Sequence, residues 1–308
     1  MTPSPPSDHL SDTQPGSSPP NTSVESQFAY GVSPGRKAFG AFMTTLVVGC
    51  ALLAALPLFS ILWTVITNGV AHLSPRVFTE LPPPPMVDGG GFRNALMGTF
   101  WVLLLASLIS VPFGILVAVY VSEFARDSQF SKFVRFGINV LSGVPSIVAG
   151  LFSYGVVVLL MGGFSAWAGG VALAVLMLPI VERTAEEGLK SIPPEIRQGA
   201  IGLGATNFQT ISQIVLPSAL PFIATGVTLS LARAIGETAP LLFTALFNQF
   251  DAKSLSDPTA TLSVLIYNFS TSPFQNQKDL AWVASLLVIG IILVISIVAR
   301  RIAQRQAF

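Results

Sequence analysis

The sequence has few of the side chains on which metal, redox and nucleophilic chemistry depend. Among its 308 residues are one cysteine, two histidines and only 10% charged residues. The lone thiol of Cys50 cannot form a disulfide within the chain, and two distant histidines cannot form a helical metal-binding motif. No glycine-rich stretch ends in Gly-Lys-Ser or Gly-Lys-Thr, the usual ATP-binding loop. We therefore expect a non-catalytic chain that binds no cofactor and no metal.

Apolar residues make up most of what is present. They account for 51% of the chain, and the mean hydropathy is +0.68. Soluble globular domains have roughly a quarter of their residues charged, so this composition indicates an all-α integral membrane protein. The net charge of +1 and the lack of a basic patch exclude a nucleic-acid-binding surface.

Long charge-free runs predict about six transmembrane helices, because about 20 apolar residues cross the hydrocarbon core. The stretch between Arg135 and Glu182 is too long for one span and suits two, the first of which contains Gly143 and Pro145. The expected spans are 39–67, 94–122, two within 136–181, 218–247 and 280–299.

The polar segments divide the chain into an N-terminal tail and one transmembrane domain that contains all of the expected spans. Residues 1–34 are rich in Ser, Pro and Thr and predict a disordered cytoplasmic tail. Residues 35–308 form the transmembrane domain, with a polar loop at 186–217. Most of the sixteen basic residues lie on the side that holds both termini, which indicates that both termini are cytoplasmic and that 69–92 and 248–279 face outside.

Two charged residues interrupt the fifth predicted span. Arg233 and Glu237 lie one turn apart, near its middle. A charge inside a bilayer costs roughly 2.5–3.5 kcal/mol on insertion scales, so such residues are candidates for a substrate pathway. The planar guanidinium of arginine matches an oxyanion. An internal ion pair with only a structural role is the alternative, and the pattern alone does not separate the two.

The polar loop predicts two helices joined by a turn. Pro193 and Pro194 suit a first helical turn, and Gly204 can end that helix. Thr206 followed by Gln209 forms a capping-box pattern at the start of a second, amphipathic helix. Such a helix beside a membrane usually lies on lipid.

A resemblance favours a partner protein over lipid. Gln198 to Pro217 resembles the EAA loop of bacterial ABC importer permeases in its small-residue triplet, glycine and Ile-x-Leu-Pro ending. The resemblance implies a type I ABC importer permease fold and docking on a separate ATP-hydrolysing subunit. The implied contact residues are Gln198, Gly199, Ala200, Gly204, Phe208, Ile214, Leu216 and Pro217. Gln198 and Gly199 stand where the family more often has Glu and Ala, which affects the acidic contact there.

A narrower resemblance indicates the substrate. LPIVERT and ARAIGETAP are similar to the A-type permeases of phosphate-specific ABC importers. That family implies a bacterial inner-membrane subunit that forms half of a phosphate pathway through Arg183, Arg233 and Glu237. The implied partners are a C-type permease, two ATP-binding subunits and an extracytoplasmic phosphate-binding protein. A C-type permease, a permease for another oxyanion and a passive anion channel remain alternatives.

Overall fold

The computed structural model describes residues 34–87, 89–125 and 128–305, and every regular element in these ranges is a helix. The predicted tail at 1–34 lies outside the described residues except for Pro34, which begins α1. Contacts divide the chain into two units, Met1–Phe59 and Ser60–Phe308, and the boundary falls within α1 (Pro34–Ala71). In the first unit most apolar side chains of this helix are exposed, as expected for a lipid-facing helix.

The second unit contains the remaining helices. In chain order they are the end of α1, the 3-10 helix η2 (Pro75–Phe78), α2 (Arg93–Val119), the π-helix η3 (Tyr120–Phe124), α3 (Gln129–Ser142), α4 (Ser146–Ser153), the π-helix η4 (Tyr154–Val158), α5 (Leu159–Met161), α6 (Ala166–Lys190), α7 (Pro194–Gly202), α8 (Asn207–Gln209), the π-helix η5 (Thr210–Val215), α9 (Leu216–Ile235), α10 (Ala239–Leu242), α11 (Leu262–Ser270) and α12 (Gln275–Arg305).

Within the described ranges, five helices are long and apolar enough to cross a membrane, and a bent pair would make six. The five are Pro34–Ala71, Arg93–Phe124, Ala166–Lys190, Asn207–Ile235 and Gln275–Arg301. The bent pair is Gln129–Ser142 with Ser146–Met161. The predicted all-helical membrane protein of about six spans is confirmed.

The third predicted span differs from a simple kinked helix. Its two halves meet at 106°, across the short break between Ser142 and Ser146. Pro145 lacks a backbone N–H and disfavours helical geometry at Val144, so the helix ends before it and restarts after it. The sequence predicts that Pro145 lies within a single span. In the structure the segment instead forms two helices, one on each side of Pro145.

The fifth span begins and ends earlier in the chain than the expected range of 218–247. Residues 207–235 form one continuous helix through α8, η5 and α9, so Pro217 does not interrupt it. Pro217 occupies the first turn of α9, where its missing N–H is tolerated after a π-helical turn. The helix stops at Ile235, well before the expected end at 247, because Gly236 caps it and Pro240 follows. Part of the loop expected at 248–279 forms α11.

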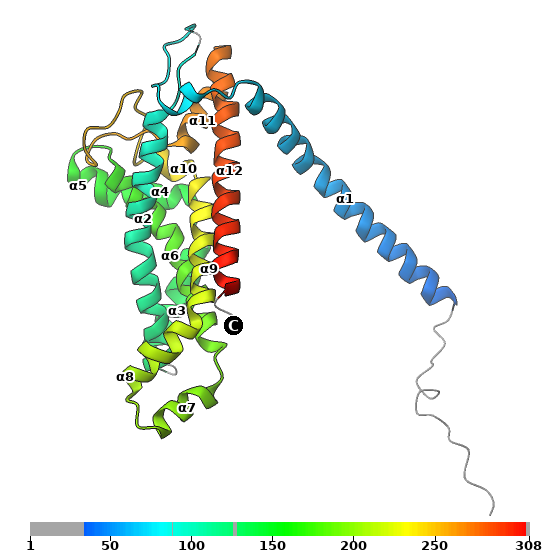
Figure 1. Cartoon of the computed structure of the whole chain (residues 1–308), viewed down its shortest axis with the longest axis vertical. Coiled ribbons are helices and arrows are strands. Elements are labelled where there is room, and N and C mark those ends of the chain that lie inside the picture. The colour runs from blue at the N-terminus through cyan, green and yellow to red at the C-terminus, as the bar shows by residue number, and fades with distance from the viewer. Residues whose placement is uncertain (1–33, 88, 126–127, 306–308) are drawn as a thin grey trace, which may run out of the picture. The chain divides into compact units, whose positions relative to one another are not determined.

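The core of the second unit is built around α6. This helix contacts α2, α3, α4 and α9, and α9 in turn contacts α12 (Figure 1). Small residues allow the close approach: a Cβ on Gly170 would lie 2.7 Å from Leu105 Cβ of α2, and one on Gly188 would lie 2.5 Å from Phe222 Cβ of α9. Facing pairs of this kind fix the position of each helix along the axis of the helix packed against it.

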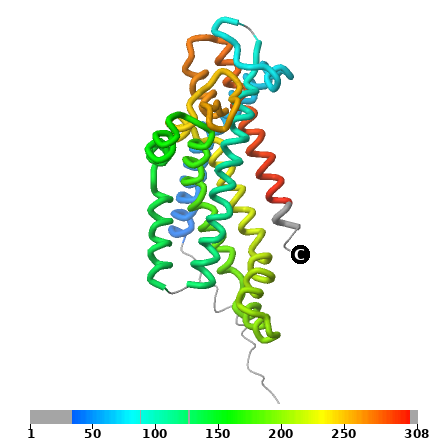
Figure 2. The backbone as a smooth tube through the Cα atoms, turned by 90° about the vertical axis from the view of Figure 1, so that its left-hand side faces the viewer, coloured from blue at the N-terminus to red at the C-terminus, as the bar shows by residue number. Residues whose placement is uncertain are grey.

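The two ends of the second unit carry different structures. Figure 2 shows α7 and α8 together at one end, here called the loop end. The irregular segments around 79–87, 89–92 and 243–261 gather at the opposite end, here called the far end (Figures 1 and 2). The segment joining α6 to α8 thus projects from the bundle, and the boundary expected at 186 falls within α6, which continues to Lys190.

Candidate functional site

Arg233 and Glu237 form the ion pair that their spacing predicts. Arg233 Nε lies 3.3 Å from Glu237 Oε1, and the two side chains are 54% and 17% exposed. The backbone of Glu237 is held by α11, because Ser263 Oγ donates a hydrogen bond to its carbonyl oxygen at 2.9 Å. The backbone at Glu237 is thus held by α11, while the more exposed guanidinium presents a planar donor group to an external anion.

The structure places Arg233 near a helix end. Arg233 lies in the last turn of α9, and Glu237 lies in the bend between α9 and α10. The sequence-based placement near the middle of a span assumed that the helix continued to residue 247, and it is therefore wrong. A discontinuous helix exposes backbone groups at the break, as in many transporter binding sites.

Arg183 lies on α6 at a different level. Its Nε is 3.8 Å from Glu187 Oε1, and both side chains are more than half exposed. The antiparallel packing of α6 and α9 shows where Arg183 lies along α9, because Thr184 faces Gly226 and Gly188 faces Phe222. Arg233 lies seven residues beyond Gly226, about 10 Å further along the bundle at 1.5 Å per residue. The structure therefore does not bring Arg183 and Arg233 into one site.

A second charged cluster near Arg183 was not predicted from the sequence. Glu186 accepts a hydrogen bond from Arg135 Nε of α3 at 2.7 Å and pairs with Lys190 Nζ at 2.7 Å. Glu182, one turn earlier on α6, is 2% exposed, and its Oε1 has no hydrogen-bond partner among the described residues. With Arg183, these residues line a cavity of about 210 Å³ between α3 and α6.

The turn in the polar loop forms as its pattern predicts, although the second predicted helix does not end at Pro217 and continues into α9. Pro194 begins α7, and Gly204 has φ +92°, a left-handed conformation that favours glycine. Both halves of the capping box are present: Thr206 Oγ1 accepts from the Gln209 N–H at 3.3 Å, and Gln209 Oε1 accepts from the Thr206 N–H at 2.9 Å. The turn and the start of the second helix are therefore locally determined.

The residues implied to contact an ATPase lie at the loop end. Among them, Gln198, Gly199, Gly204, Phe208 and Pro217 are exposed, Ile214 and Leu216 are half-buried, and Ala200 is buried. Phe208 is 71% exposed, and the neighbouring Leu203 is 92% exposed. Exposed large apolar side chains on a polar projection are typical of a surface that binds another protein.

The loop is fastened to the bundle by an ion pair that sequence reasoning also missed. Arg197 of α7 pairs with Glu123 of η3, with Nη2 2.8 Å from Oε1. The two side chains are only 15% and 5% exposed. No local pattern could reveal this contact, because the partners lie 74 residues apart in the chain.

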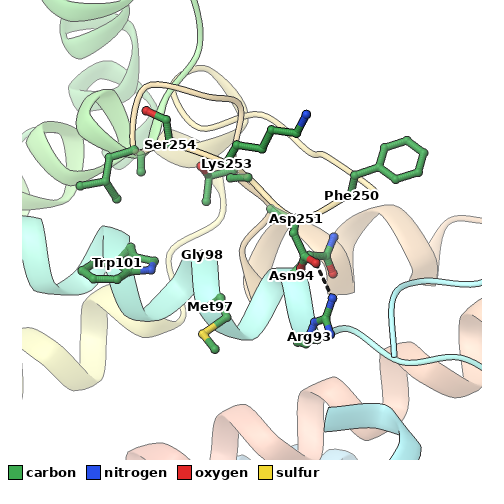
Figure 3. Close-up of a pocket in the computed structure, with 14 residues that line it drawn as sticks. Arg93, Asn94, Met97, Gly98, Trp101, Phe250, Asp251, Lys253 and Ser254 are labelled. Atoms are coloured by element: carbon green, nitrogen blue, oxygen red, sulfur yellow. Dashed lines mark hydrogen bonds and ion pairs between the residues drawn. The ribbon is translucent and has the colours of Figure 1, made fainter. Parts of the chain in front are cut away.

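The far end holds a larger cavity, of about 580 Å³ (Figure 3). Arg93 at the start of α2 and Asp251 of the 243–261 segment point toward one another and form an ion pair. Asn94 Nδ2 donates to the carbonyl oxygen of Asn248 at 2.6 Å. These contacts hold the 243–261 segment over the start of α2 and leave a cavity open at this end, lined by both polar and apolar side chains.

Comparison with known proteins identifies the family. Residues 110–307 match the family described as the binding-protein-dependent transport system inner membrane component. A phosphate transport system permease protein PstA from Yersinia pestis is 43% identical over 80% of this chain and 83% of its own length. The chain belongs to this inner membrane component family. That membership, with its apolar helices, makes it a multi-pass membrane protein.

Other relatives extend the comparison. PstA 1 from Mycobacterium tuberculosis is 35% identical over 85% of this chain and 84% of its own length. A probable ABC transporter permease protein, YqgI from Bacillus subtilis, is 32% identical over 82% of this chain and 90% of its own length. The identity to PstA proteins confirms the resemblance to A-type permeases.

Solved structures share the fold of this inner membrane component. A chain of a bacterial alginate ABC transporter superposes with a TM-score of 0.63 at 16% identity, covering 86% of this chain and 94% of that one. A chain of the MetNI methionine ABC transporter gives 0.56 at 19% identity, covering 70% and 93%. The predicted type I ABC importer permease fold is thereby confirmed.

Proposed function

We propose that this chain is the transmembrane permease subunit of an ATP-driven phosphate importer and forms half of its translocation pathway. The observation that carries the proposal is the 43% identity to a phosphate transport system permease over 80% of the chain. Relatives with the same name in Pasteurella multocida and Haemophilus influenzae are each 42% identical. The family name indicates a transport component, which supports a non-catalytic role.

Phosphate passes Arg233 and Arg183 in turn. The half-exposed guanidinium of Arg233 binds phosphate oxygens, and Glu237 at 3.3 Å reduces its net charge so that the anion is released. Arg183, about 10 Å nearer the loop end, is a second phosphate-binding position beside the Glu186 cluster. An arginine whose charge is partly offset binds an anion only moderately, which suits a pathway and not a storage site.

The loop end docks on the ATPase. Exposed Phe208 and Leu203 supply an apolar surface, and the rigid turn at Gly204 holds α7 and α8 at a fixed angle. Two ATP-binding subunits bind and hydrolyse ATP, so this chain needs no cofactor of its own. A C-type permease completes the pathway, and an extracytoplasmic phosphate-binding protein delivers the anion to the far end.

With the ATPase at the loop end and the binding protein at the far end, the chain has one orientation in the bacterial inner membrane. The loop end and both termini are cytoplasmic, and the 69–92 and 248–279 segments face outside, as the distribution of basic residues indicates. A passive anion channel would have no use for an exposed apolar loop of this kind. Importers of other oxyanions would share the loop, whereas the relatives at 42–43% identity are named as phosphate transport permeases.

The proposal is tested in the native host, where all partner subunits are present. Deleting the gene for this chain should abolish ATP-dependent uptake of radiolabelled phosphate from phosphate-limited medium and leave sulfate uptake unchanged. A plasmid copy should restore phosphate uptake. Loss of sulfate uptake with intact phosphate uptake would assign the chain to another oxyanion.

A further inference from the structure

Arg197 makes an unusually complete set of contacts for a loop residue. Its Nη2 and Nε donate to the two carboxylate oxygens of Glu123 at 2.8 and 3.2 Å. Its Nη2 also donates to the carbonyl oxygen of Leu189 at 2.8 Å, and its Nη1 donates to that of Ile192 at 2.5 Å. The guanidinium therefore binds four acceptors at once.

These acceptors belong to the ends of two different spans and to the link that follows α6. Glu123 lies in η3, the π-helical end of the span that begins with α2, and Leu189 lies in the last turn of α6. Leu189 and Ile192 also belong to a buried apolar cluster with Val215 and Ala219. The guanidinium is thus anchored on a packed part of the bundle.

The contacts add a charged donor at the end of α6, where the Leu189 carbonyl also accepts from the Ile192 N–H at 3.4 Å. The last carbonyls of a helix have no intrahelical donors, and a cation there also interacts favourably with the helix dipole. A bidentate arginine–carboxylate pair fixes orientation as well as distance, which a lysine cannot do. Because both charges are mostly buried, removing either one leaves the other uncompensated.

Little else in α7 is buried against the bundle. Ala200 is the one buried residue of this helix, whereas Glu195, Ile196, Gln198 and Gly199 are exposed. Helix α7 also contacts η5 and follows α6 after a short link, and Arg197 adds a side-chain contact from α7 to the ends of both α2 and α6.

We propose that Arg197 is the positioning residue that transmits movement of α7 to the ends of α2 and α6. The inference rests on the proposed function, because it requires an ATPase that moves the loop. Arg183 lies six residues before Leu189 on α6, about 9 Å at 1.5 Å per residue, so movement of this helix end displaces a pathway residue directly. The Arg197–Glu123 pair thus couples the loop to the phosphate path.

The test uses the complete transporter in proteoliposomes and measures phosphate uptake and ATP hydrolysis on the same sample. Arg197→Gln should retain the ATPase subunits during purification and lower the phosphate transported per ATP by about tenfold or more. Glu123→Gln should lower the same ratio. Arg197→Lys should restore part of it, since a lysine can reach the carboxylate without reproducing the fork. Lys132→Gln, a change at an exposed lysine of α3, should leave the ratio unchanged.

A charge exchange separates coupling from simple loss of a charge. Glu123→Arg combined with Arg197→Glu restores the ion pair between the elements but not the bonds to Leu189 and Ile192, so partial recovery of the ratio is expected. A wild-type ratio in Arg197→Gln would overturn the inference alone. Loss of subunit assembly and thermal stability in Arg197→Gln, Glu123→Gln, Arg197→Lys and the exchanged pair would also overturn it, since the role would then be purely structural. Failure of the wild-type transporter to import phosphate would overturn the proposed function as well.

Discussion

Arg233 has a mostly buried ion-pair partner, Glu237, and a side chain that is itself exposed. Its ion pair with Glu237 involves Nε, while 54% of the side chain remains accessible. A purely structural ion pair would be expected to bury both partners, because an exposed i,i+4 pair contributes only about 0.3–0.5 kcal/mol. The exposure therefore favours a role in binding over a role in stability.

Substitutions of Arg233 should separate these roles. Arg233→Gln should lower phosphate uptake at least about tenfold while the complex still assembles, and Arg233→Lys should recover little, because the planar fork is lost. Uptake and subunit co-purification measure the two effects.

The double variant Arg233→Gln with Glu237→Gln is the decisive control. Replacing both ends of a structural ion pair can be nearly neutral, so a structural role predicts recovered uptake. A pathway role predicts that uptake stays low. Wild-type uptake in the double variant would contradict the assignment of Arg233.

At the scale of elements, the close contact of α6 and α9 depends on Gly226. A Cβ there would overlap the Thr184 side chain, lying 2.6 Å from its Cβ. Gly226→Ala should destabilise the purified chain by about 1–3 kcal/mol, the usual effect of overpacking. Gly290→Ala in α12 is the matched control, since its Cβ meets nothing within 4 Å. Equal melting temperatures for the two variants would mean that this contact is looser than the structure indicates.

The exposed apolar surface of the loop end makes a separate prediction. Phe208→Asp places a charge where a partner groove would exclude water, so the ATPase should co-purify with the variant at least about tenfold less efficiently. Gln213→Asp, an exposed change in the same continuous helix, should have little effect. If both variants retain the ATPase equally, Phe208 lies outside the interface.

Local signals accounted for most of the elements, whereas long-range contacts could not be predicted from them. The capping box of Thr206 and Gln209 and the left-handed Gly204 depend on neighbouring residues, so the sequence was sufficient. The early end of α9 depends on Gly236 acting as a cap within an apolar run, where hydropathy gives no boundary. The Arg135–Glu186 pair joins residues 51 apart, and in the sequence its buried neighbour Glu182 marks only the end of a charge-free stretch.

At the scale of the whole molecule, the orientation can be tested by chemical labelling. In a Cys50→Ala background, Ser256→Cys at the far end should react with an impermeant thiol reagent in intact spheroplasts. Gln129→Cys, at the start of α3, should react only after lysis. Both positions are exposed in the structure, so accessibility does not limit the comparison. The reverse labelling pattern would invert the orientation.

The central claim is that this chain passes phosphate through the membrane at the expense of ATP. The most direct measurement is uptake of radiolabelled phosphate into proteoliposomes that contain the chain with its partner permease, two ATPase subunits and the phosphate-binding protein. Uptake should require hydrolysable ATP and the binding protein, and a large excess of sulfate should not reduce it. Phosphate flux without ATP, or equal competition by sulfate, would contradict the account.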